Sequence, residues 1–176
     1  MNYHKIEKNS IANGTGVRVV LWVSGCSIHC KGCQNPETWD FNSGKPFDHD
    51  AAKELLQALD KPYIQGLTLS GGHPLDYDNL IDVYDIITLV RETMPQKDIW
   101  LYTGCTLNIR DFDTSVNVCW DNGLLRNYIL ANCDVVVDGP YIEEQRDITL
   151  PWRGSRNQRV IDVKETIKQG EIVLWK

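Results

Sequence analysis

The chain has 176 residues, of which 42% are hydrophobic and 24% are charged, and its formal net charge at pH 7 is -6. Such a composition is typical of one globular domain with its own core, and we expect a single domain over residues 1–176. The acidic balance argues against a nucleic-acid binder, which usually has a basic surface. No apolar stretch reaches the ~18 residues of a membrane span, and the N-terminal segment lacks the apolar region of a signal peptide. We therefore predict a cytoplasmic protein without a membrane partner.

The predicted elements begin with a strand over residues 17–23, a β-branched and apolar run typical of a strand buried on both faces. The later elements are predicted as a helix over 50–59 capped by Asp48 or Asp50, a strand over 66–70, a helix over 79–94, a strand over 99–102, a helix over 124–130, a strand over 133–137, and a closing pair of strands over 160–163 and 171–175. Residues 111–120 look like an irregular insertion. Strands separated by helices indicate βαβ units.

This order predicts an α/β fold with a mostly parallel sheet. The chain is too short for an eight-unit barrel of about 250 residues, so an open, partial (β/α) barrel is expected. In such sheets, sites gather at the carboxyl ends of the strands. Cys26, Gly71, Gly104 and Gly139 each follow one of the first four predicted strands. We expect the four loops that carry them to meet at one rim.

The loop after the first strand holds three cysteines within eight residues, Cys26, Cys30 and Cys33. Thiolates are soft ligands that select iron–sulfur clusters, zinc or copper(I). A [4Fe-4S] cluster ordinarily takes four cysteines, so three would leave one iron free to bind a substrate. The spacing favours this cluster over redox thiols or a structural zinc site. Zinc would need a fourth ligand, and the candidates are His29, Cys105, Cys119 and Cys133.

Two other segments carry candidate binding groups. Paired glycines, Gly71-Gly72, let the backbone approach a ligand closely, although they also suit an ordinary turn between a strand and a helix. The next residue, His73, is either a ligand contact or a solvated loop histidine. Residues 152–159 include three arginines that could bind a carboxylate or an acidic partner surface, or could form a solvated loop. The cysteines best explained as core or loop thiols are Cys105, Cys119 and Cys133.

Further motifs accompany the cysteine loop along nearly the whole chain. They are Asn13-Gly14, Ser24-Gly25-Cys26, the run His29 to Asn35, Thr38-Trp39, the run Asn42 to Phe47, Leu69 to Gly72, Asp98 to Trp100 with Tyr102 to Gly104, Val137 to Tyr141, and Trp152 to Ser155 with Asn157-Gln158. With these motifs the sequence resembles the radical S-adenosylmethionine superfamily. Within it, the sequence is most similar to the activating proteins of anaerobic (class III) ribonucleoside-triphosphate reductases.

The resemblance implies a partial barrel of the radical S-adenosylmethionine type and a specific set of site residues. Cys26, Cys30 and Cys33 would bind three irons of one [4Fe-4S] cluster, and S-adenosylmethionine would chelate the fourth iron. The residues that would contact S-adenosylmethionine are Gly32, Cys33, Gln34, Gly71 and Gly72. His73 stands where the family usually has an acidic residue, and a histidine can accept a hydrogen bond from an ammonium group only when it is neutral. The stretch 105–120 is also longer than usual.

The resemblance further implies an activity. One electron from the reduced cluster would cleave S-adenosylmethionine to methionine and a 5′-deoxyadenosyl radical. This radical would take a hydrogen atom from a glycine of the reductase large subunit and leave a glycyl radical. A reducing electron donor is then a second partner, and no side chain is expected to act as a catalytic acid or base. The alternatives are an activase of another glycyl-radical enzyme, a small-molecule radical enzyme, and a zinc-stabilised binding module without activity.

Overall fold

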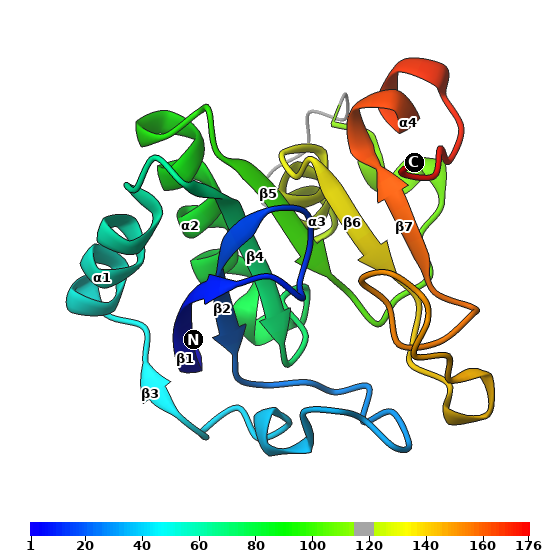
Figure 1. Ribbon diagram of the computed structural model, residues 1–176, viewed down its shortest axis with the longest axis horizontal. Coiled ribbons are helices and arrows are strands. Elements are labelled where there is room, and N and C mark those ends of the chain that lie inside the picture. Colours follow the sequence, from blue (N-terminus) through cyan, green and yellow to red (C-terminus); the bar gives the residue numbers. More distant parts are fainter. Residues whose placement is uncertain (115–121) are drawn as a thin grey trace.

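A single open sheet of seven strands organises the described residues, 1–114 and 122–176, of the computed structural model (Figure 1). Its strand order is β3-β1-β2-β4-β5-β6-β7. The strands are β1 Asn2–Ser10, β2 Val17–Val23, β3 Lys45–Pro46, β4 Ile64–Gly71, β5 Asp98–Tyr102, β6 Val135–Asp138 and β7 Arg159–Asp162. The α-helices are α1 His49–Leu59, α2 Leu80–Thr93, α3 Asn122–Ala131 and α4 Val163–Gln169.

The centre of the sheet is parallel and its flanks are antiparallel. Strands β2, β4, β5 and β6 pair in parallel. Strands β1 and β3 add an antiparallel ribbon at one edge, and β7 pairs antiparallel with β6 at the other. The sheet does not close on itself. The predicted open α/β fold is thereby confirmed, with the carboxyl ends of four neighbouring strands at one rim.

The two faces of the sheet bury different side chains, because successive residues of a strand point to opposite faces. Alternate strand residues, such as Leu21, Leu69 and Leu101, join the main core with residues of α1, α2 and α3. The intervening residues face the other side, where Trp100, Val135, Val137 and Val160 form a smaller cluster. Figure 1 shows that this second face is covered by loops rather than by a full layer of helices. It is therefore the face on which a ligand cavity can form.

A buried arginine closes the amino-terminal end of the loop-covered face. The Arg18 guanidinium lies 2.5 Å from Asp98 Oδ1 and donates a 2.8 Å hydrogen bond to Thr68 Oγ1. It also lies 5.2 Å from the ring centre of Trp100, a favourable cation–π distance. The Trp100 ring contacts Trp152 edge-on at 5.2 Å. Through the contact between Trp100 and Trp152, these side chains hold the segment around Trp152 against the amino-terminal end of the sheet.

Several predicted elements differ from the structure. The N-terminal strand β1 was not predicted, because its sequence is mostly polar and only Tyr3 and Ser10 are buried. The second strand predicted at 171–175 is wrong, since this segment makes only an isolated bridge between Ile161 and Leu174. Helix α4 lies between β7 and this segment, and it ends at Gly170, which has a left-handed φ of 71°. Most of the predicted insertion at 111–120, including Cys119, lies outside the described residues.

The helix predicted over 50–59 is confirmed, and its cap is Asp48. The Asp48 side chain accepts hydrogen bonds from the Asp50 and Ala51 amides, which have no partner inside the helix. The helix predicted over 79–94 corresponds to α2, with Asn79 and Met94 as the flanking residues. None of the helices in the described ranges is long and apolar enough to cross a membrane.

Candidate metal centre

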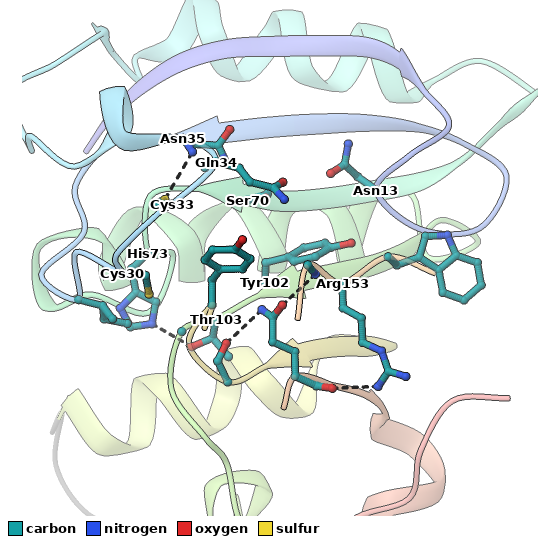
Figure 2. A pocket seen from close by; sticks show the side chains of 18 of the residues that line it. Asn13, Cys30, Cys33, Gln34, Asn35, Ser70, His73, Tyr102, Thr103 and Arg153 are labelled. Carbon is teal, nitrogen blue, oxygen red and sulfur yellow. Dashed lines mark hydrogen bonds between the residues drawn. The ribbon is translucent and has the colours of Figure 1, made fainter. Parts of the chain in front are cut away.

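A cavity of about 550 Å³ lies at the carboxyl ends of the parallel strands, on the loop-covered face (Figure 2). Cys26, Gly71, Gly104 and Gly139, one from each loop after β2, β4, β5 and β6, all line it. The predicted meeting of four loops at one rim is therefore confirmed. A volume of this size is typical of a small-molecule site.

All three cysteines of the loop after β2 line this cavity. The Cys33 amide donates a 3.1 Å hydrogen bond to the Cys30 carbonyl and forms a tight turn. The Asn35 amide donates to Cys33 Sγ at 3.4 Å. Burial raises the pKa of the Cys30 thiol, and the nearby Cys33 and Cys26 thiols raise it further, against a hydrogen bond from the Tyr141 backbone. The Cys30 sulfur is thus within electrostatic range of both other cysteines.

The donor set fits an iron–sulfur cluster better than zinc. Three thiols line one cavity. Among the described residues, no three metal-ligating side chains are already grouped closely enough to hold a metal ion. The three thiols would therefore have to turn toward a common centre to bind a cluster. The zinc alternative needs a fourth ligand, and none of its described candidates lines the cavity. Cys133 is buried and donates to the Ile129 carbonyl, and His29 stacks on Trp39 at 4.6 Å. Three soft donors beside open space match a cluster with one free iron.

Backbone hydrogen bonds hold the start of the cysteine loop. The Gly25 amide donates to the Thr38 carbonyl at 2.8 Å, and the Cys26 amide donates to the Trp39 carbonyl at 3.0 Å. Gly25 has φ 91°, and a Cβ at this position would lie 2.1 Å from the Phe41 ring. Only glycine can occupy this position without moving the ring. The loop is therefore anchored immediately before its first cysteine.

The glycine pair packs directly against the cysteine loop. The Gly72 amide donates to the Val23 carbonyl, and the His73 amide donates to the Gly25 carbonyl, both at 2.8 Å. A Cβ on Gly72 would lie 2.5 Å from the Gly25 carbonyl oxygen. Both Gly71 and Gly72 also line the cavity. The sequence predicted that the backbone of these glycines approaches a ligand closely. The structure shows that it also packs closely against the backbone of the cysteine loop.

Two polar residues that the sequence did not reveal tie the loops together. Buried Asn79 donates through Nδ2 to the Ser24 carbonyl at 3.0 Å and the His73 carbonyl at 3.1 Å. Asp76 accepts hydrogen bonds from the Ser27 amide at 2.8 Å and the Ser27 hydroxyl at 2.6 Å. Burial opposes the ionised form of Asp76, but the Ser27 hydrogen bonds outweigh it and lower its pKa. Each residue directly precedes a helix, Asp76 a short 3-10 helix and Asn79 helix α2, so the sequence alone indicates only an ordinary capping role.

His73 is buried at the cavity wall, so the alternative of a solvated loop histidine is wrong. The side chain is 6% exposed, and Nε2 lies 2.9 Å from Thr103 Oγ1 (Figure 2). Its Nδ1 has no hydrogen-bond partner among the described residues, and Oδ2 of Asp76 lies 3.7 Å from it. Burial lowers the pKa of His73 to about 4, although the Asp76 carboxylate opposes this shift. The imidazole is therefore neutral at physiological pH, which is the state in which it can accept a hydrogen bond from an ammonium group.

The His73 pKa predicts a pH dependence of stability. The unfolded chain gains a proton on His73 near pH 6.5 and the folded chain only near pH 4, so stability is lost as the pH falls from 6.5 toward 4. Between about pH 7.5 and about pH 5.5, the free energy of unfolding should fall by about 1 kcal/mol more than in His73→Gln. Urea unfolding of both cluster-free proteins measures this difference. Identical pH dependence in the two proteins would show that His73 titrates normally.

The C-terminal segment 152–159 is an internal brace rather than a solvated loop. Gln158 Oε1 accepts the Gly154 and Ser155 amides at 2.9 and 3.1 Å, and its Nε2 donates to the Gly139 carbonyl at 3.1 Å. Two of its arginines already have acidic partners, Arg159 with Asp138 and Arg156 with Asp147. Arg153 lines the cavity, and its buried Nε has no hydrogen-bond partner among the described residues. This arginine alone of the three is placed to meet a carboxylate in the cavity.

The cysteine loop also meets the loop after β6, so loops join the two ends of the rim where the sheet itself stays open. Lys31 Nζ lies 3.6 Å from Glu143 and 3.5 Å from Glu144. These ion pairs are exposed and contribute little stability. Gly32 lies against the Glu143 carboxylate and is not among the cavity-lining residues, unlike Gln34. The structure therefore places four of the five predicted cofactor contacts at the cavity, namely Cys33, Gln34, Gly71 and Gly72.

Comparisons with known proteins agree with this site. Residues 12–161 match the family described as "4Fe-4S single cluster domain". An anaerobic ribonucleoside-triphosphate reductase-activating protein of Pasteurella multocida is 40% identical over 160 residues, which cover 90% of this chain and 95% of the relative. Proteins of the same name are 39% identical in enterobacteria phage T4, over 91% of this chain and 93% of the relative, and 36% identical in Escherichia coli K12, over 91% and 97%. The resemblance read from the sequence is confirmed.

Proposed function

Since this chain belongs to the family of anaerobic ribonucleoside-triphosphate reductase-activating proteins, we propose that it activates such a reductase by generating a glycyl radical on it. The observation that carries the proposal is the cavity lined by three cysteines of one loop, beside a glycine pair and without a fourth cysteine among its lining residues. This arrangement supports a [4Fe-4S] cluster with one iron open to S-adenosylmethionine. The protein is then an oxidoreductase whose substrate is another protein.

We assign Cys26, Cys30 and Cys33 as the cluster ligands, and Gln34, Gly71 and Gly72 as contacts of S-adenosylmethionine. We also assign Gly32 as a backbone contact of S-adenosylmethionine, although it is not among the cavity-lining residues. When bound, the two groups supply a one-electron reductive cleavage that gives methionine and a 5′-deoxyadenosyl radical. The unpartnered Arg153 Nε and the neutral His73 offer polar atoms for the amino-acid end of S-adenosylmethionine.

The remaining residues of the site position these groups. Asn79 and Asp76 hold the cysteine loop and the His73 loop at a fixed separation through hydrogen bonds to backbone atoms and Ser27. The brace around Gln158 fixes the loop after β6 on the opposite side of the cavity. Loops rather than strands complete the rim, and we propose that a peptide segment of the reductase enters the cavity between these loops. No side chain has to transfer a proton.

We further propose that the open sheet is a reduced barrel of the radical S-adenosylmethionine type, with residues 1–176 forming one domain. The parallel strands β2, β4, β5 and β6 supply the βα half of such a barrel. The flanking strands β1, β3 and β7 end the sheet antiparallel. A cytoplasmic location stays a prediction from the sequence.

The test is an anaerobic assay with the reconstituted protein and the reductase large subunit. With a reductant and S-adenosylmethionine, the protein should release 5′-deoxyadenosine, and the reductase should show the electron paramagnetic resonance signal of a glycyl radical. A protein that purifies with about one zinc and no iron or sulfide would support a binding module instead. A fully loaded protein that cleaves no S-adenosylmethionine would refute the proposed activity.

A further inference from the structure

The indole of Trp39 carries a buried N–H group without a partner. Among the described residues, its Nε1 atom is buried and makes no hydrogen bond. A buried donor that stays unpaired costs free energy, so native structures nearly always supply a partner from the protein, from water or from a ligand. The other buried side-chain nitrogens without a partner in the described ranges are His73 Nδ1 and Arg153 Nε, and both residues line the cavity. Unpaired nitrogens thus mark the place where cofactors would bind.

Trp39 packs directly on the cysteine loop. Its carbonyl accepts the 3.0 Å hydrogen bond from the Cys26 amide. Its ring stacks on the His29 ring, with the ring centres 4.6 Å apart and the planes 25° apart. His29 lies between Cys26 and Cys30 in the sequence, so both the backbone and the ring of Trp39 contact the first half of the loop. Unlike His73, Trp39 does not line the cavity, so the loop and the group it binds offer the partner for its N–H.

Two of the three cysteine sulfur atoms already have an N–H donor. The Asn35 amide donates to Cys33 Sγ at 3.4 Å (Figure 2). A hydrogen bond from the Tyr141 backbone acts on the Cys30 thiol and works against the rise of its pKa. In the described ranges no donor of this kind reaches Cys26 Sγ. The sulfur without a donor therefore belongs to the cysteine whose amide is bonded to Trp39.

We propose that Trp39 donates its indole N–H to the Cys26 thiolate when the cluster is bound, and that this hydrogen bond makes the cluster easier to reduce. Hydrogen bonds to the sulfur ligands are among the factors that set the reduction potential of an iron–sulfur cluster. The positive end of an N–H group stabilises the additional negative charge of the reduced state. The turning of the thiols toward a common centre would bring Cys26 Sγ to the indole. The inference rests on the cluster of the proposed function, but not on the identity of the protein substrate.

The test is the midpoint potential of the reconstituted cluster in Trp39→Phe, measured by electron paramagnetic resonance in an anaerobic redox titration without the reductase. Phenylalanine keeps an aromatic ring to stack on His29 and removes the N–H group. At a fixed solution potential, the ratio of reduced to oxidised cluster should fall about tenfold. For a one-electron couple this corresponds to a midpoint potential lower by about 59 mV. Iron content should stay complete, because the three cysteines are unchanged.

Trp22→Phe is the matched control, because it removes an indole N–H that already has a partner. Trp22 lines the cavity, and its Nε1 donates to Glu7 Oε2 at 3.0 Å. The midpoint potential of this variant should equal that of the wild type. An unchanged potential in Trp39→Phe would overturn the inference, and so would an equal shift in Trp22→Phe.

A second measurement on the wild-type protein does not depend on how well a variant folds. With the heavy nitrogen isotope in the indole rings, pulsed electron paramagnetic resonance of the reduced cluster should detect a coupled indole nitrogen, and Trp39→Phe should lack this coupling. A reduced wild-type cluster without any coupled indole nitrogen would refute the hydrogen bond. A wild-type protein that binds no iron and sulfide would instead contradict the proposed cluster.

Discussion

Replacement of Cys30 by alanine is expected to abolish cluster binding and, with it, all cleavage of S-adenosylmethionine. Cys30 is the middle cysteine of the loop, and its thiol lies within electrostatic range of both others. Two remaining thiols cannot hold a [4Fe-4S] cluster that is already one cysteine short of the usual four. Iron and sulfide analysis after anaerobic reconstitution measures the loss, and the visible absorption of the cluster should disappear with it.

The control is Cys133→Ala, because Cys133 is buried beside α3 and does not line the cavity. Burial raises the pKa of its thiol strongly, which also makes it a poor ligand. This variant should lose about 1 kcal/mol of stability through the lost packing and keep a full complement of iron. Retention of iron and activity in Cys30→Ala would contradict the ligand assignment.

Gly72→Ala is expected to lower the free energy of unfolding by about 2–3 kcal/mol and to reduce cluster content. The added Cβ would lie 2.5 Å from the Gly25 carbonyl oxygen and 3.1 Å from the Gly25 amide nitrogen. Both neighbours are backbone atoms, which cannot turn aside as a side chain can. The cysteine loop would therefore have to move away from β4 and carry Cys26 with it. Urea unfolding and iron analysis measure the two effects.

Gly104→Ala provides the comparison, because Gly104 lines the same cavity on the loop after β5. Its added Cβ would meet the flexible end of the Ile28 side chain at 2.4 Å, and a rotation of that side chain relieves the contact. We expect a cost below about 1 kcal/mol and normal iron content. Equal losses in the two variants would show that contact with the cysteine-loop backbone is not what requires glycine at position 72.

The parts of the fold that the sequence predicted are those with a strong periodic signal. The apolar run of β2 and the helical spacing of α2 gave the correct element types and nearly the correct ends. Strand β1 was not predicted, because it is a strand through its pairing with β2 and its composition gives no strand signal. The segment 171–175 failed for the opposite reason, since it is apolar enough for a strand but makes only one bridge.

The same division applies to the site. The cysteine spacing and the glycine pair predicted the metal centre, because each is a local pattern with a chemical meaning. The sequence left the role of His73 open and gave no signal for Asp76 and Asn79, because these roles depend on contacts with loops far away in the chain. Asn79 hydrogen-bonds to Ser24, 55 residues before it. The burial that keeps His73 neutral likewise comes from packing of the loops after β4 and β5.

The central claim is that the cavity brings the reductase glycine directly to the cleaved S-adenosylmethionine. A reductase labelled with deuterium at the glycine α-carbon tests it in one measurement, the mass of the 5′-deoxyadenosine formed together with the glycyl radical. Direct transfer predicts that the product gains one deuterium for each radical formed. Radical formation accompanied by unlabelled 5′-deoxyadenosine would contradict the claim.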